Sequence, residues 1–261
     1  MVPEAERIAG QDPGGCKAMN AENRTIRSGR MHYCPVCGHT IAQRLIGDVM
    51  DELGIRERTI GTAPVGCAVL LYDYFNCDII ECPHGRIPAV ATGIKRMRPD
   101  NIVFAYGGDG DLLSIGLAET IHCANRGENI TMIFINNAVY GMTGGQMAPT
   151  TLIGQKTITT PEGRMSTETG SPLRICEMFA TLSSPVFIER VAVHDAPHMQ
   201  RAKQAIRKAF VNQIEGKGFS FVEVLSMCPT HWRMGGKESC QFVGNEMAGY
   251  FPIKKFRDVD G

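Results

Sequence analysis

Two glycine-rich polar loops carry the residues best suited to hold a metal ion and a phosphate. Gly107-Gly108-Asp109-Gly110-Asp111 and Asn136-Asn137-Ala138-Val139 each follow a short apolar run with the character of a buried strand. Because the carboxyl ends of parallel strands share one edge of a sheet, we expect the two loops to meet there. Asp109, Asn137 and the Val139 carbonyl then offer three oxygens to one Mg²⁺, and the glycines let the backbone approach a bound diphosphate.

The first loop fits neither of two common nucleotide-binding motifs. A phosphate-binding loop of the NTPase type has Lys and Ser or Thr after its glycines, where Asp111 and Leu112 stand. A dinucleotide fingerprint has a third glycine at the position of Leu113. The alternative is a tight turn in which Asp109 caps the next helix. The Asn-Asn pair after the following strand favours the cation site over a simple turn.

The cysteines form a second candidate site. The chain has ten, with Cys34 and Cys37 in a Cys-x-x-Cys pair. No export signal precedes them, so we expect a cytoplasmic protein with reduced thiols rather than a disulfide framework. A redox dithiol, a zinc site and an iron–sulfur cluster all remain open. Zinc commonly takes a second Cys-x-x-Cys, which the chain lacks, whereas a cluster can take Cys67 and Cys228 from distant loops.

The other cysteines carry less information. Three lie on apolar segments and are expected to be small buried hydrophobes, and a fourth, next to Pro83, is interpreted as an incidental neighbour of the pocket. These are Cys77, Cys123, Cys176 and Cys82. Cys16 and Cys240 have no assigned role.

Composition and hydrophobic spacing predict an α/β protein. The 261 residues carry 27 basic and 27 acidic side chains, a balance that argues against nucleic-acid or membrane-surface binding. No apolar run reaches the roughly 20 residues of a membrane span. Alternating strands and helices predict a mostly parallel sheet with helices on both faces. Expected strands are 102–106, 130–135, 186–193 and 219–225; expected helices are 40–53, one from Leu113, 172–182 and 198–215.

The domain organisation is expected to be simple. Residues 1–30 are polar and aperiodic, which predicts an N-terminal arm. Residues 31–261 are expected to form a single cofactor-binding domain with a C-terminal extension. Residues 141–171 are rich in Gly, Thr and Pro and predict a long functional loop.

The motifs resemble a known family. Gly-Asp-Gly followed by Asn-Asn, with 28 positions from Asp109 to Asn137, resembles the diphosphate-binding motif of thiamine diphosphate enzymes. The continuation NNAVYGMTGGQMAPTT resembles the β-subunit of the 2-oxoacid:ferredoxin oxidoreductases, of the 2-oxoglutarate and 2-oxoisovalerate types. The resemblance extends from about Tyr33 to Phe256 and implies the thiamine diphosphate-binding fold.

The resemblance also implies site residues. Asp109, Asn137 and Val139 are expected to bind Mg²⁺, and Cys34, Cys37, Cys67 and Cys228 a [4Fe-4S] cluster. The cofactor is expected to contact residues of several loops, namely Gly66, Cys67, His84, Gly85, Gly108, Asp109, Gly110, Asp111, Asn137, Val139, Gly141 and Met142. One departure is Val36, where family members often have Gly.

The segment Pro83-His84-Gly85-Arg86 matches a pocket motif of the family. From the residues alone, His84 and Arg86 suit anion binding and are the candidate catalytic residues, with a surface turn as the alternative.

The resemblance implies oxidative decarboxylation of a 2-oxoacid to acyl-CoA and CO₂, with electrons passed to ferredoxin. The glutamate that activates thiamine has no candidate in this chain, so an α-type partner subunit is expected. A γ-type subunit that binds coenzyme A and a small ferredoxin-like subunit are expected as well. Three alternatives remain: a non-oxidative thiamine diphosphate-dependent decarboxylase subunit, a structural zinc or cluster protein, and a disulfide reductase.

Overall fold

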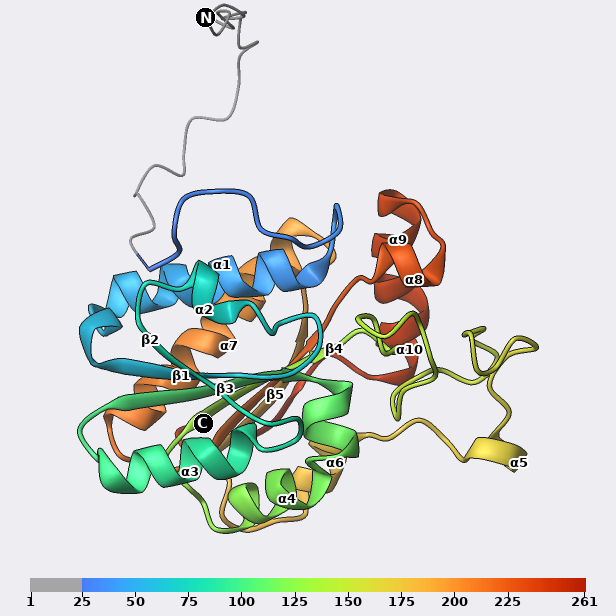
Figure 1. Ribbon diagram of the computed structural model, residues 1–261. Helices are drawn as coiled ribbons and strands as arrows, with labels where there is room; N and C mark the ends of the chain where they lie inside the picture. Colours follow the sequence, from blue (N-terminus) through green and yellow to red (C-terminus); the bar gives the residue numbers. More distant parts are fainter. Residues whose placement is uncertain (1–24) are drawn as a thin grey trace, which may run out of the picture.

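The core of the protein is a seven-stranded sheet, seen edge-on in Figure 1. The computed structural model describes residues 25–261. The strands are β1 (Thr59–Ala63), β2 (Asp78–Glu81), β3 (Ile102–Gly108), β4 (Thr131–Asn136), β5 (Phe187–Ala192), β6 (Ser220–Leu225) and β7 (Lys255–Asp258). Their order is β2-β1-β3-β4-β6-β5-β7, and every pair is parallel except β5 with β7. The expected mostly parallel sheet is confirmed.

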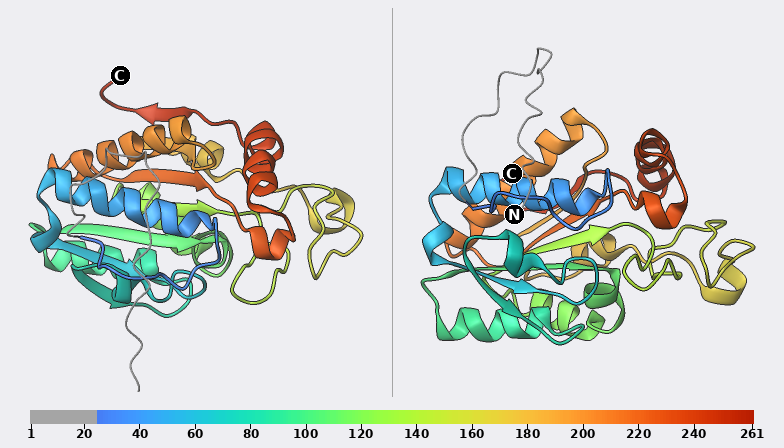
Figure 2. Two further views of the ribbon diagram at one scale, coloured as in Figure 1. Left: turned by 90° about the horizontal axis from the view of Figure 1, so that it is seen from above. Right: turned by 45° about the horizontal axis from the view of Figure 1, so that its top comes forward.

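Helices cover both faces of this sheet (Figures 1 and 2). One face carries α1 (Gly38–Leu53), α2 (Leu71–Tyr74) and α7 (Ala196–Ile214). The other face carries α3 (Ile87–Met97), α4 (Leu117–Asn125) and α6 (Ile175–Ala180). Each layer has its own apolar core, one around Phe104 and Phe210 and the other around Phe134 and Phe179. Burial on both sides explains why the central strands are continuously apolar.

Local signals set the ends of the two long helices. The apolar residues of α1 recur at helical spacing, and Gly54 ends the helix in a left-handed conformation. At the start of α7, the Asp195 side chain accepts a hydrogen bond from the backbone N–H of His198, as an N-cap residue does. The expected helices over 40–53 and 198–215 are therefore confirmed, with boundaries shifted by about two residues.

Other elements differ from expectation or were not foreseen. The helix expected from Leu113 begins earlier, as a π-helical turn over Gly110–Ser114 that leads into α4. Strands β1 and β2 and helix α3 were not expected. Strand β2 is largely exposed, so it lacks the apolar run that marks a buried strand.

The segments at the carboxyl edge of the sheet are mostly loops. The loop over 141–171 contains only α5 (Ser166–Thr169) as a helix and projects away from the sheet (Figure 1). Beside it lie α8 (Pro229–Trp232), α9 (Gly236–Phe242), a π-helical turn (Val243–Met247) and α10 (Ala248–Tyr250).

The described part of the expected arm begins at Thr25. Its backbone N–H and hydroxyl both donate to Asp51, 3.2 and 2.7 Å away, near the end of α1. Cys16 and the rest of residues 1–24 lie outside the described residues. Within residues 25–261, no helix is both long and apolar enough to cross a membrane.

Candidate functional site

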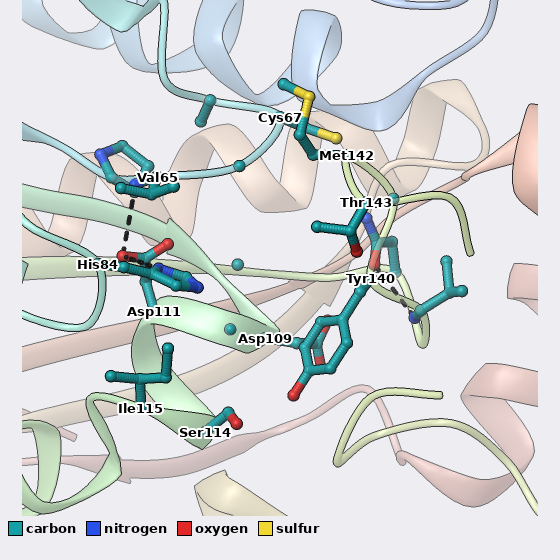
Figure 3. A pocket seen from close by; sticks show the side chains of 18 of the residues that line it. Val65, Cys67, His84, Asp109, Asp111, Ser114, Ile115, Tyr140, Met142 and Thr143 are labelled. Carbon is teal, nitrogen blue, oxygen red and sulfur yellow. Dashed lines mark hydrogen bonds and ion pairs between the residues drawn. The ribbon is translucent and has the colours of Figure 1, made fainter. Parts of the chain in front are cut away.

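A cavity of about 200 Å³ opens at the carboxyl edge of the sheet. The loops that follow β1, β2, β3 and β4 form its walls, and Figure 3 shows their side chains. The lining residues are His39, Pro64, Val65, Gly66, Cys67, Ala68, His84, Gly108, Asp109, Gly110, Asp111, Ser114, Ile115, Asn137, Val139, Tyr140, Gly141, Met142 and Thr143. The structure thus brings the two motif loops together in one site, as the sequence predicts.

Asp109 has the properties of a metal ligand. Its carboxylate is buried, Oδ1 accepts a hydrogen bond from the Thr150 hydroxyl, and Oδ2 has no hydrogen-bond partner among the described residues. Burial raises the pKa of Asp109 to about 7, and the hydrogen bond from Thr150 opposes that rise. A buried carboxylate with an unpartnered oxygen is costly unless a cation balances its charge. Asp109 therefore fits Mg²⁺, which prefers oxygen ligands.

The second loop is held in an unusual conformation. Ala138 has a φ of 56°, in the left-handed region, which a non-glycine residue adopts only when its surroundings require it. The side-chain oxygens of Asn136 and Asn137 accept hydrogen bonds from the backbone N–H groups of Ala138 and Val139, at 3.2 and 3.3 Å. Trp232 Nε1 donates to the Asn137 carbonyl at 3.1 Å. These bonds fix Asn137 and Val139 on the cavity wall beside Asp109.

A buried charge network supports this loop from below. Glu223 Oε1 accepts a hydrogen bond from Asn136 Nδ2 at 2.7 Å, and its Oε2 accepts one from Arg190 Nε at 2.7 Å. Arg190 in turn forms two bonds with Glu177, of 3.0 and 2.7 Å. Glu223 and Arg190 are fully buried. The sequence analysis did not identify Glu223 or Arg190. Each is a charged residue inside an apolar strand, and that pattern could have identified them.

If the cavity holds the expected thiamine diphosphate and Mg²⁺, replacing Glu223 with glutamine should weaken their binding. The carboxylate accepts from three donors, Asn136 at Oε1 and both Arg190 and the Cys176 thiol at Oε2, whereas an amide has one oxygen and two N–H groups. Arg190 and Asn136 would compete for that oxygen, and the Asn136–Val139 loop would lose its fixed position. Loss of an outer-shell partner typically costs roughly 10- to 100-fold in metal affinity. Titration of the purified protein with the cofactor in excess Mg²⁺ measures the effect.

Glu177→Gln is the matched control for this variant. It also removes the negative charge of a residue paired with Arg190, but it leaves the Glu223–Asn136 hydrogen bond in place. If both variants lose affinity to the same extent, Glu223 acts only through the charge of Arg190 and does not position the loop.

Asp111 joins three of the loops around the cavity. Its Oδ1 accepts hydrogen bonds from the backbone N–H groups of Gly85 at 2.9 Å and Val65 at 3.5 Å. His84 Nδ1 lies 3.0 Å from the same oxygen, and dashed lines mark interactions of Asp111 in Figure 3. His84 lines the cavity. Arg86 is not among the lining residues; its guanidinium pairs with Glu119.

The four candidate cluster ligands come from three separate segments that meet beside the cavity. Cys34 and Cys37 precede α1, Cys67 follows β1 and Cys228 follows β6. The backbone N–H of Gly38 donates to the Met227 carbonyl at 3.2 Å and so holds the first segment against the last. A side chain at Gly141 would have its Cβ 3.1 Å from Cys67 Sγ and 3.6 Å from Cys228 Sγ. The absence of a side chain there lets the cavity loop approach both sulfurs.

The distances between these sulfurs distinguish a single zinc ion from an iron–sulfur cluster. Burial, with the charges of the neighbouring Cys37, Cys67 and Cys34 thiols as smaller causes, raises the pKa of Cys228 to about 12. However, among the described residues no three cysteine sulfurs lie within 4.8 Å of one another. Tetrahedral zinc with bonds of about 2.3 Å would hold its sulfurs roughly 3.8 Å apart. The wider set fits a polynuclear cluster better than a single zinc ion.

Comparison with known proteins identifies the family of the chain that forms this cavity. Residues 64–224 match the model of the thiamine pyrophosphate enzyme C-terminal TPP-binding domain. The 2-oxoglutarate synthase subunit KorB of Methanocaldococcus jannaschii is 36% identical over 77% of this chain and 70% of its own length. The chain belongs to the thiamine pyrophosphate enzymes, among the subunits of 2-oxoacid:ferredoxin oxidoreductases.

Two further relatives are informative. The ketoisovalerate oxidoreductase subunit VorA of Methanothermobacter thermautotrophicus is 54% identical over 87% of this chain but only 48% of its own length. The chain therefore spans about half the length of that relative. The solved 2-oxoglutarate:ferredoxin oxidoreductase from Magnetococcus marinus aligns with a TM-score of 0.73 and 26% identity, over 88% of this chain and 74% of that one. This likeness agrees with the expected fold of the thiamine pyrophosphate enzymes.

The backbone of the Cys-x-x-Cys turn is strained at Val36. Val36 has a φ of 62° and its side chain is 45% exposed. That left-handed conformation favours glycine and strains a β-branched residue. The glycine that the family resemblance leads us to expect at this position would relieve that strain, and the valine side chain is exposed beside Gly236.

The remaining cysteines lie outside the set of four. Cys123 and Cys176 are fully buried, as expected, and Cys77 is partly buried. Cys82 is buried and its thiol donates to the Ile80 carbonyl at 3.5 Å. Cys240 lies on α9 and is partly buried.

Proposed function

We propose that this chain is the catalytic β-type subunit of a 2-oxoacid:ferredoxin oxidoreductase, with thiamine diphosphate, Mg²⁺ and one [4Fe-4S] cluster. It would convert a 2-oxoacid and coenzyme A to an acyl-CoA and CO₂ and pass two electrons to ferredoxin. Family membership supports the thiamine cofactor. The other parts of the proposal rest on the residues around the cavity.

Bound thiamine diphosphate supplies a carbon nucleophile and an electron sink for decarboxylation. Asp109, Asn137 and the Val139 carbonyl would hold Mg²⁺, which in turn binds the diphosphate. Asp111 keeps the surrounding loops in register through Gly85, Val65 and His84. This rigid wall would orient the cofactor and limit access of water to the reacting carbon.

The observation that carries the oxidative part of the proposal is the position of Cys67. It lines the cavity and is also one of the four neighbouring thiols. Gly141 likewise belongs to the cavity wall and contacts the sulfur group. A cluster on Cys34, Cys37, Cys67 and Cys228 would therefore lie directly against the cofactor, where it could accept electrons one at a time. A non-oxidative decarboxylase has no use for such a set.

A branched-chain 2-oxoacid such as 2-oxoisovalerate is the substrate that we favour. The relative with 54% identity is named for ketoisovalerate, whereas relatives named for 2-oxoglutarate are 36% identical or less. Val65, Ile115 and Met142 offer apolar surface to the cavity. Within residues 25–261, no Lys or Arg lines it, so this chain supplies no cationic partner for the second carboxylate of 2-oxoglutarate.

The active site is expected to need a partner subunit. No glutamate of the described residues lines the cavity, so an α-type subunit would supply the one that activates thiamine. A γ-type subunit would carry the coenzyme A site, and a small ferredoxin-like subunit would extend the electron path. The Magnetococcus enzyme is described with coenzyme A bound.

The proposal can be tested on the anaerobically purified complex. With 2-oxoisovalerate and coenzyme A, we expect reduction of ferredoxin together with formation of isobutyryl-CoA. We expect kcat/KM for 2-oxoisovalerate to exceed that for 2-oxoglutarate by at least about tenfold, since pocket contacts of one or two groups give 10- to 200-fold discrimination. Absorbance of ferredoxin and chromatography of the acyl-CoA measure both.

Two outcomes would contradict the proposal. Release of CO₂ and free aldehyde without ferredoxin reduction would identify a non-oxidative decarboxylase. Equal or better use of 2-oxoglutarate would retain the oxidoreductase but overturn the substrate.

A further inference from the structure

A second group of metal-ligating side chains lies outside the cavity and the cysteine set. It consists of His194, Asp195 and His198, at the turn between β5 and α7. One ligand atom from each residue lies within 4.8 Å of the other two. Among the described residues, no other trio of His, Cys, Asp or Glu meets this limit.

The contacts within this group are close. His198 Nδ1 lies 2.6 Å from Asp195 Oδ1, and His194 Nε2 lies 3.5 Å from Asp195 Oδ2. The two imidazole rings have centroids 4.2 Å apart. The Asp195 carboxylate also caps α7, and the positive end of that helix dipole favours its charged form. The group therefore presents a carboxylate flanked by two imidazoles.

His194 is not satisfied by the protein alone. Its side chain is only 12% exposed, and its Nδ1 is buried without a hydrogen-bond partner among the described residues. The π-helical turn Val243–Met247 packs against the ring, and a Cβ at Gly244 would lie 3.1 Å from His194 Nε2. A glycine at that position leaves the imidazole uncrowded. The other ring nitrogen, Nε2, faces Asp195 and is the atom that an ion held by this carboxylate would bind.

We infer that His194, Asp195 and His198 bind one divalent transition-metal ion of the zinc class. Two imidazoles and one carboxylate match the ligand types of Zn²⁺, with water or another group in the fourth position. Imidazole selects such ions over Mg²⁺ and Ca²⁺, which prefer oxygen ligands only.

The ion would stiffen the turn between β5 and α7. All three ligands belong to the turn after β5 and the first turn of α7, and the π-helical turn packs against His194 there. The site shares no residue with the cavity or with the four cysteines, so it is independent of the proposed reaction.

The test is zinc binding by the purified protein with its cluster in place. Calorimetric titration with ZnCl₂ is expected to give about one zinc per chain, since residues 25–261 hold a single such trio. Asp195→Asn removes the charge but keeps a good N-cap residue, so it preserves α7. This variant and His198→Ala are expected to weaken binding at least about tenfold. His122→Ala, at an exposed histidine of α4, is the matched control and should bind as the unmodified protein does.

Cobalt(II) spectra separate this site from the cysteine set. Binding at the histidines is expected to give weak ligand-field bands that Asp195→Asn abolishes, without the intense sulfur charge-transfer absorption of a multi-thiolate site. The inference is overturned if zinc does not bind, if Asp195→Asn and His122→Ala bind it equally well, or if the cobalt spectrum is that of several thiolates.

Discussion

Replacing Asp109 with asparagine is expected to abolish thiamine diphosphate binding under ordinary assay conditions. The substitution removes the negative charge and leaves an N–H₂ group where one carboxylate oxygen faces the cavity without a partner. Removal of an outer-shell partner already costs roughly 10- to 100-fold in metal affinity, so loss of a direct ligand should cost more. Calorimetric titration with thiamine diphosphate in excess Mg²⁺ measures the change.

Asp73→Asn is the matched control, because Asp73 is an exposed aspartate on α2 outside the cavity. Iron content and far-ultraviolet circular dichroism should be unchanged in both variants, which separates loss of the cofactor from loss of the fold. If Asp109→Asn retains its affinity for the cofactor, Asp109 is not a ligand of the metal, and the proposed site formed with Asn137 is wrong.

Replacing Cys228 with alanine is expected to remove the proposed cluster while leaving thiamine binding largely intact. A [4Fe-4S] cluster takes four thiolates, and Cys228 lies with Cys67 against Gly141. Iron and acid-labile sulfide should fall from about four of each per chain to nearly none. The electron paramagnetic resonance signal of the dithionite-reduced protein should disappear with them. Metal analysis and spectroscopy on anaerobically purified protein measure these changes.

Cys77→Ala provides the comparison for this experiment, since Cys77 is partly buried but does not belong to the set of four. It should retain full iron and sulfide. A Cys228 variant with unchanged iron and sulfide would show that the cluster ligands lie elsewhere. Zinc in place of iron in the unmodified protein would instead support a structural metal site.

The sequence by itself determined the features that depend on local pattern. Continuous apolar runs at 102–106 and 219–225 indicated strands buried on both faces, and helical spacing indicated α1 and α7. The motifs around Asp109 and Asn137 identified both cavity loops, because the carboxyl ends of parallel strands must share an edge. The four cysteines were also chosen from sequence, by their neighbours and by the family resemblance.

Elements with weak local signals were visible only in the structure. Strand β2 is largely exposed and pairs with β1; its existence depends on that pairing rather than on its own apolar content. The edge strand β7 is similar, with a register shift in its pairing to β5. Such strands are defined by the neighbour that supplies their hydrogen bonds.

Only the tertiary structure decided which side chains meet. Asp111 joins Val65, Gly85 and His84, and Glu223 supports Asn136 from another strand. His194 meets Asp195 and His198 through the course of one turn, with Gly244 brought in from a later segment. Local periodicity reports which face of an element is buried. The direction of a buried polar side chain is set instead by the partner it needs, and that partner comes from a strand or loop that only folding brings near.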